Sequence, residues 1–312
     1  MLNVAVPPPT IASRVTQSRR DPVLVTGATG RIGRLVVDEL LRMGTPVRAL
    51  TRRLAQAALP AGVEVVAGDF TDPSSLDAAL DGVASVFLVW TAPPATAPEV
   101  VARIAGRSSS PARRIVYLSA PFRTPHPFFQ QPNPMRELHA EVERLLAATD
   151  MDVAIIRPGM FASNALHWWA PQIRAGDVVR WPYADVETAP IDERDVAAVA
   201  ARVLADDRHS RGDWVLTGPE SLSHAAQVHA IGNAIGRPIR FEELTPEEFR
   251  RQAEGAWPPG VAEMLLDAWR AALDRPAFVS DAVREILGVP ARSFREWAGD
   301  NASAFSRERQ PR

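Results

Sequence analysis

Lysine and cysteine are absent from this chain of 312 residues, and tyrosine occurs only twice. All 35 basic side chains are therefore arginine. The absence of lysine excludes Schiff-base catalysis and also a lysine that lowers the pKa of a catalytic tyrosine. The absence of cysteine excludes disulfides, thiolate catalysis and cysteine-bound metal or iron–sulfur centres. This composition fits a cytoplasmic protein, which is the location we expect.

A strong net charge and long apolar runs are also absent. The formal net charge is -2, so we expect no general affinity for nucleic acid. No apolar run approaches the roughly 20 residues that cross a bilayer, so we expect no membrane segment. Residues 1–20 contain three consecutive prolines and lack the continuous apolar stretch of a secretory signal. We expect these residues to form a flexible tail.

Short apolar runs alternate with helical patterns through the first half of the chain, which is typical of βαβ units and a parallel sheet. The expected strands are 22–26, 46–50, 63–67, 85–90, 114–119 and 153–157. The expected helices lie near 31–43, 73–81, 97–107 and 134–148. The pattern predicts an α/β fold, with a Rossmann-type doubly wound parallel sheet that forms a dinucleotide-binding domain over residues 21–157.

Beyond residue 157 the pattern becomes irregular. A helix near 194–205 and a strand near 213–217 are expected to return to the sheet. The rest of residues 158–312 is expected to form a small, mostly helical substrate lobe, with helices near 260–273, 280–287 and 293–304. Thr245-Pro-Glu-Glu248 predicts the start of a further helix, because it has the form of a capping box with proline at the first helical position. We expect a monomer or a homodimer.

The strand at 22–26 leads directly into a turn marked by glycines and then into an amphipathic helix. Gly27 permits the tight turn, Gly30 lets the backbone approach a pyrophosphate, and Gly33 lets the helix pack closely on the strand. Free N–H groups and the positive end of the helix dipole favour an anion at this point. The alternative is that the glycines serve the turn alone. The residues expected to contact the dinucleotide here are Gly27, Thr29, Gly30, Arg31 and Ile32.

The end of the second strand indicates which dinucleotide is bound. A site specific for NAD places an acidic residue there to hold the ribose 2′-hydroxyl. This chain instead has Arg52 and Arg53. Guanidinium groups match a 2′-phosphate in charge and geometry, which favours NADP as the cofactor. The alternative is that both arginines are solvated charges at the start of a helix.

Four further residues are expected along the crevice formed by the strand ends. Asp69 follows the third strand, where it either binds the adenine or caps a turn, and Phe70 packs beside it. Trp90 ends the fourth strand and either lines the nicotinamide or packs in the core. Pro158 follows the sixth strand and is also expected at the cofactor.

Several segments together resemble the NmrA-like branch of the atypical short-chain dehydrogenase/reductases, over roughly residues 22–305. They are Thr26-Gly-Ala-Thr-Gly-Arg-Ile-Gly33, Gly68-Asp69-Phe70, Tyr117-Leu-Ser119, Ile156-Arg157-Pro158-Gly159, Ala189-Pro-Ile-Asp-Glu-Arg-Asp195 and Leu287-Gly-Val-Pro. The resemblance implies a Rossmann domain, NADP binding and a small C-terminal substrate lobe. Members of that branch include quinone, azo-dye and triphenylmethane reductases, and also regulators that bind the dinucleotide without turning it over.

The chain departs from the short-chain dehydrogenase pattern at its Tyr-x-x-x-Lys pair, where Met135 and His139 stand instead. Ser119 matches the position of the usual catalytic serine. Glu143 lies one helical turn from His139, and a carboxylate there would raise the pKa of the imidazole for proton donation. The alternative is that this pair only braces the helix. Tyr183 is the remaining catalytic candidate, as a relocated acid.

The segment beyond the sixth strand is rich in aromatic residues, and in it we expect Phe161, Asn164 and Trp168 to bind substrate. Such rings suit a flat, conjugated molecule, although they fit a hydrophobic plug between the lobe and the sheet equally well. No metal site is expected, because two ligands do not hold a zinc ion.

These features predict a reductase that uses NADP to pass hydride to an aromatic, quinone-like or conjugated carbonyl substrate, without the usual tyrosine–lysine pair. The expected partner is therefore a small aromatic molecule. Two alternatives stay open. One is a non-catalytic redox sensor or regulator that binds NADP, and the other is a non-redox lyase, isomerase or cyclase that retains it.

Overall fold

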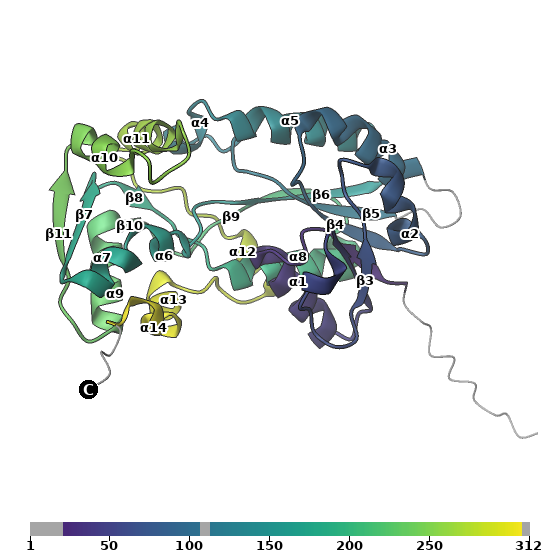
Figure 1. Cartoon of the computed structure of the whole chain (residues 1–312), viewed down its shortest axis with the longest axis horizontal. Helices are drawn as coiled ribbons and strands as arrows, with labels where there is room; N and C mark the ends of the chain where they lie inside the picture. The colour runs from purple at the N-terminus through teal and green to yellow at the C-terminus, as the bar shows by residue number, and fades with distance from the viewer. Residues whose placement is uncertain (1–20, 107–112, 308–312) are drawn as a thin grey trace, which may run out of the picture.

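A parallel sheet of seven strands forms the centre of the computed structural model, which describes residues 21–106 and 113–307 (Figure 1). The predicted tail at residues 1–20 lies outside the described residues. The strand order is β3-β2-β1-β4-β5-β6-β9, and each neighbouring pair is parallel. The strands are β1 (Val23–Val25), β2 (Val47–Thr51), β3 (Glu64–Ala67), β4 (Ser85–Val89), β5 (Arg114–Leu118), β6 (Asp152–Pro158) and β9 (Gly212–Leu216). The predicted Rossmann-type fold is confirmed, and β9 is the strand that was expected to return to the sheet.

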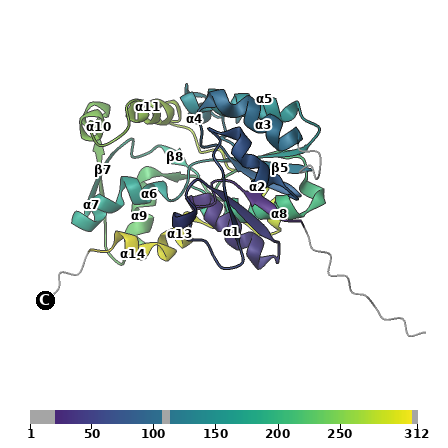
Figure 2. The same cartoon turned by 45° about the vertical axis from the view of Figure 1, so that its right-hand side comes forward.

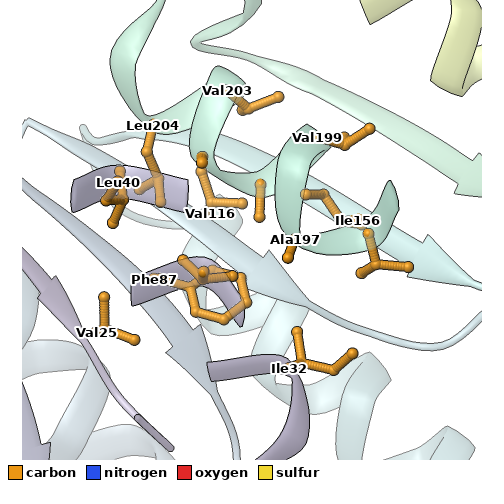
Figure 3. Packing of buried hydrophobic residues seen from close by; sticks show 14 of the residues in the cluster. Val25, Ile32, Leu40, Phe87, Val116, Ile156, Ala197, Val199, Val203 and Leu204 are labelled. Carbon is orange, nitrogen blue, oxygen red and sulfur yellow. The ribbon is translucent and has the colours of Figure 1, made fainter. Parts of the chain in front are cut away.

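One face of the sheet is covered by α1 (Arg31–Arg42) and α8 (Glu193–Ala205), which pack against each other. Ile32 and Leu40 of α1 are buried against Val25, Phe87 and Val116 of the strands (Figure 3). Val199 and Val203 of α8 belong to the same cluster. Because the strands are covered by helices, they read in the sequence as continuous apolar runs.

The other face is covered by α2 (Asp77–Leu80), α3 (Ala97–Gly106) and α5 (Pro134–Ala147) (Figure 1). Residue 107, where the third helix was expected to end, lies outside the described residues. Tyr117 of β5 is fully buried in this layer. The order of the strands reverses between β1 and β4, and ligands of such sheets bind at the carboxyl ends of the strands next to that point.

A second lobe lies beside the carboxyl ends of the strands (Figures 1 and 2). Its strands form two small pairs, β7 (Val178–Pro182) with β11 (Arg240–Leu244) and β8 (Glu187–Thr188) with β10 (Leu222–Ser223). Its helices are α6 (Asn164–Trp168), α7 (Ala170–Ala175), α9 (His224–Ala234), α10 (Pro246–Ala253), α11 (Val261–Ala271), α13 (Phe294–Asp300) and α14 (Ala302–Phe305). The predicted capping box at Thr245 is present at the start of α10.

The assignment of the helix near 280–287 to this lobe was wrong. The helix found there, α12 (Ala282–Leu287), packs against α8 and β9 instead. Ala282, Val283 and Ile286 are buried in the cluster between the sheet and α8. These apolar positions would suit the surface of the lobe as well as the surface formed by α8 and the sheet, so the sequence pattern does not indicate which of the two they cover.

The lobe also contacts the connection between β5 and α5. That connection contains the short helix α4 (Pro127–Gln130), which packs against α11. Phe128 of α4 packs against the apolar cluster of the lobe. Within the described ranges, no helix has both the length and the apolar character needed to span a membrane.

Candidate active site

A cleft with a volume of about 660 Å³ runs along the carboxyl ends of the strands. Its walls come from residues in or directly after β1, β2, β3, β4 and β5. Since neighbouring strands lie about 4.8 Å apart, five strands span about 19 Å, which suits an elongated ligand. The predicted cofactor residues that line it are Gly27, Thr29, Gly30, Arg31, Ile32, Arg52, Arg53, Asp69 and Phe70. Lining residues that were not expected from the sequence include Thr26, Gln56, Thr71, Pro93 and Leu118.

The glycine turn has the geometry of a phosphate cradle. Gly27 has a φ of 61°, in the left-handed region. A Cβ atom on Gly33 would lie 2.1 Å from the Gly27 carbonyl oxygen, so only glycine allows this approach of helix and turn. Gly30 caps α1, whose first turn contains no acidic residue. Arg34 braces the turn by donating from Nε to the Thr29 carbonyl at 3.0 Å. The positive helix end and the exposed backbone therefore fit a pyrophosphate.

Thr26 ties the turn to the neighbouring strand. Its Oγ1 accepts a hydrogen bond from the Val89 N–H at 2.8 Å and donates one to the Phe87 carbonyl at 3.1 Å. The hydroxyl is buried and joins the ends of β1 and β4 at the switch point. The only signal in the sequence was a threonine directly before the first glycine.

At the far end of the cleft, Arg52 and Arg53 are exposed. Arg53 donates to the Gln56 Oε1 at 3.2 Å. The Asp69 carboxylate accepts a hydrogen bond from the Thr71 N–H at 2.9 Å, which lowers the pKa of Asp69, and nearby Arg52 lowers it further. Asp69 therefore caps a turn, the alternative given above, and also lines the cleft.

Trp90 and Pro158 are not among the lining residues of the cleft in the described part of the chain. The Trp90 ring packs against Phe70 with 5.2 Å between centroids, and its indole N–H donates to the Ala92 carbonyl. Trp90 is therefore a core residue behind Phe70, as the alternative interpretation of Trp90 predicted. Pro158 ends β6 and pairs with Leu216 of β9.

Ser119 belongs to a buried network of charges at the end of β5. Its Oγ donates to the Glu143 Oε1 at 2.5 Å. Arg157 donates two hydrogen bonds to the same carboxylate, at 2.7 and 2.9 Å, and also binds Asp213. The side chains of Arg157 and Glu143 are 1% and 2% exposed. Arg123 adds a second cation, 3.2 Å from the Glu143 Oε2.

The predicted pairing of His139 with Glu143 was wrong. The His139 Nδ1 lies 2.6 Å from the Tyr117 hydroxyl oxygen, and Glu143 binds Arg157 instead. Burial lowers the pKa of His139, which outweighs the opposing effect of Glu143, so the expected rise in its pKa was also wrong. Burial raises the pKa of Tyr117. Both rings are therefore neutral near pH 7 and hydrogen-bonded to each other.

Tyr183 and the predicted substrate residues lie in the lobe or at its junction with the sheet. Tyr183 has a φ of 55° and packs against the lobe cluster. Trp168 stacks on Trp181 with 5.5 Å between centroids. Phe161 bridges to Ile191, and the Asn164 N–H donates to the Phe161 carbonyl. The aromatic rings thus form a packed core, as the alternative of a hydrophobic plug predicted. Other members of this core include Trp169, Phe249, Trp257 and Trp269.

A second, apolar pocket of about 180 Å³ lies between the β5–α5 connection and α11. Both cavities reach the end of β5, because Leu118 lines the cleft and Ala120, two residues further along the chain, lines the pocket. A dry cavity of about 150 Å³ accommodates a benzene molecule, so this pocket has room for one ring. The sequence analysis missed it, because its walls come from segments far apart in the chain. They include Phe122, Phe128, Phe129, Met160, Met264 and Leu265.

Within residues 21–106 and 113–307, no group of three or more histidine or acidic side chains is arranged to hold a metal ion.

The sequence matches the family described as NAD(P)H-binding over residues 27–207. It is 38% identical over 288 residues to the (4-alkanoyl-5-oxo-2,5-dihydrofuran-3-yl)methyl phosphate reductase of Streptomyces griseus, and this match covers 92% of this chain and 100% of that protein. It is 33% identical over 290 residues to the NAD(P)H azoreductase of Xenophilus azovorans, with 91% and 99% covered. The fold resembles the NADPH-dependent quinone oxidoreductase of Escherichia coli complexed with NADPH, with a TM-score of 0.74, 24% identity, and 89% and 99% of the chains covered.

Proposed function

The chain belongs to the NAD(P)H-binding family, and we propose that it is an NADPH-dependent reductase of flat, conjugated acceptors such as quinones, azo compounds and unsaturated carbonyls. The observation that carries this proposal is the presence of two cavities at the end of β5. One is the elongated cleft with its glycine turn, and the other is an apolar pocket that has room for one ring. The curated relatives named azoreductase and quinone oxidoreductase support the same class of acceptor.

The residues of the cleft fit NADPH. The turn from Gly27 to Gly33 would hold the pyrophosphate, and Arg52 and Arg53 would meet the 2′-phosphate of the ribose. When bound, the cofactor supplies a hydride and the protein orients it.

The side chains at the end of β5 argue for a conjugated acceptor. The Ser119 proton is directed to Glu143, and His139 and Tyr117 are hydrogen-bonded to each other. None of these three residues is among the described lining residues of the pocket, which argues against proton donation from them to a ligand there. A quinone, azo compound or unsaturated carbonyl spreads the negative charge that it receives, so water suffices as the proton donor. A saturated ketone would form a localised alkoxide, which needs a positioned acid.

The test is to follow NADPH absorbance with a matched pair of ketones, cyclohexenone and cyclohexanone, and with menadione and para methyl red. We expect oxidation of NADPH with the conjugated acceptors and none with cyclohexanone. Equal rates with the two ketones would contradict the argument about proton donation. Tight binding of NADPH without turnover of any acceptor would favour the redox sensor instead.

A further inference from the structure

Three arginines surround the ring of Phe122, which lines the apolar pocket. The guanidinium carbons of Arg157, Arg123 and Arg136 lie 5.0, 5.8 and 6.0 Å from the ring centroid. Arg157 and Arg123 are both paired with Glu143, and Arg157 also binds Asp213.

Arg136 differs from the other two arginines because no carboxylate in the described ranges lies within ion-pair distance of it. Three cations therefore face two carboxylates around this ring, which leaves one positive charge without a carboxylate partner in the described part of the chain.

The unpaired cation belongs to the wall of the pocket. Arg136 lines the pocket and is exposed, so it lies at the rim. The pocket has no acidic residue among its described lining residues. Each of its two side-chain amides already makes one hydrogen bond, since the Asn133 Oδ1 accepts from the Met135 N–H and the Gln131 Nε2 donates to the Pro127 carbonyl. Arg136 thus offers free charged donors beside an apolar space that has room for one ring.

We propose that the natural acceptor carries an anionic group, and that Arg136 binds this group while the conjugated ring fills the pocket. This inference rests on the reductase function proposed above and specifies its substrate class. A guanidinium group binds the two oxygens of a carboxylate, sulfonate or phosphate through paired hydrogen bonds. Because Arg136 lies at the rim and is partly screened by water, we expect the anion to improve binding by about tenfold.

The experiment compares para methyl red with its methyl ester, two azo dyes that share one chromophore and differ in a single negative charge. KM for each dye is measured with saturating NADPH for the unmodified protein and for Arg136→Gln. The control is Arg144→Gln, which removes an exposed arginine from the other end of α5, where it pairs with Glu141. We expect KM to be about tenfold lower for the acid than for the ester, in the unmodified protein and in the control. Arg136→Gln should abolish this difference by raising KM for the acid alone.

Two outcomes would overturn the inference while leaving the reductase function in place. One is equal KM for the two dyes in the unmodified protein, and the other is an undiminished preference for the acid in Arg136→Gln. If neither dye is reduced, equilibrium dialysis of each dye against the protein with NADPH decides the point separately. Tighter binding of the acid that Arg136→Gln abolishes would support the inference, and equal or absent binding of the two dyes would refute it.

Discussion

Replacing Arg157 with methionine should destabilise the protein by about 3–5 kcal/mol, the usual cost of removing one partner from a buried ion pair. The structure places this substitution at the upper end of effects on stability. Arg157 is 1% exposed and donates two hydrogen bonds to Glu143, which is 2% exposed. Without Arg157, that carboxylate would keep Ser119 and Arg123 as its partners among the described residues, and the side chain of Arg123 is 60% exposed. Methionine preserves most of the volume, so the loss reports on charge rather than on a cavity.

Two further variants separate the buried pair from the exposed one. Asp213 also binds Arg157 but is 43% exposed, so Asp213→Asn should cost about 1 kcal/mol or less. The double variant Arg157→Met with Glu143→Leu removes both buried charges. Because neither charge is then left alone, the double variant should be at least about 2 kcal/mol more stable than the sum of the single effects implies.

The assay is equilibrium unfolding in urea, followed by circular dichroism, with NADPH affinity as a check that each variant folds correctly. A loss below about 1 kcal/mol in Arg157→Met would refute the reasoning, because it would mean that Glu143 finds water or another partner. Additive effects in the double variant would refute it as well, since buried partners must be coupled.

Two changes in the cleft and two in the lobe give further tests. The double variant Arg52→Ala with Arg53→Ala should weaken NADPH binding several-fold in calorimetry and leave NADH binding nearly unchanged, because charge-assisted hydrogen bonds contribute about 1.5–3 kcal/mol. Tighter binding of NADH than of NADPH by the unmodified protein would contradict the choice of NADP. Gly33→Ala should abolish NADPH binding, since its Cβ would lie 2.1 Å from the Gly27 carbonyl oxygen, and unchanged affinity would mean that this turn does not hold the phosphates. Tyr183→Phe should change the rate by less than about twofold, whereas a loss of 10²–10⁴-fold would identify a relocated acid. Burial lowers the pKa of His224 from 6.5 to about 4, so the unfolded chain binds the proton more readily and the free energy of unfolding should fall as the pH drops from 6.5 towards 4. In urea titrations, His224→Phe should reduce this dependence of the free energy of unfolding on pH, and an unchanged dependence would assign it to other groups.

The sheet and the cofactor cleft were predictable because their signals are local. Strands covered on both faces read as apolar runs, and all six strands expected before residue 158 are present. The glycine turn was predictable for a similar reason, since the close approach of Gly33 to Gly27 is determined by neighbours in the sequence. The lobe was less predictable. Its strand β11 is largely polar and lies in a two-stranded pair, so it lacks the apolar signature of a central strand.

The partner of Glu143 was not predictable from the sequence. The helical spacing rule favours His139, four residues earlier, because both side chains lie on one face of α5. The structure instead brings Arg157 of β6 to the same carboxylate. A buried carboxylate gains more from a guanidinium that binds both oxygens than from an imidazole whose positive charge burial disfavours. His139 then pairs with Tyr117, a residue on the neighbouring strand that no spacing rule connects to it.

The same contacts bear on how the proposed reductase would work without a tyrosine–lysine pair. In that pair, a free cation beside a phenol lowers the pKa of the phenol. Here the buried cation nearest to Ser119 is Arg157, and two carboxylates already neutralise it. The charge that stays unpaired is on Arg136, at the rim of the apolar pocket rather than beside a phenol. Under the proposed function, the positive charge of this site would bind a substrate rather than activate an acid, and selectivity would depend on the electron demand and the charge of the acceptor.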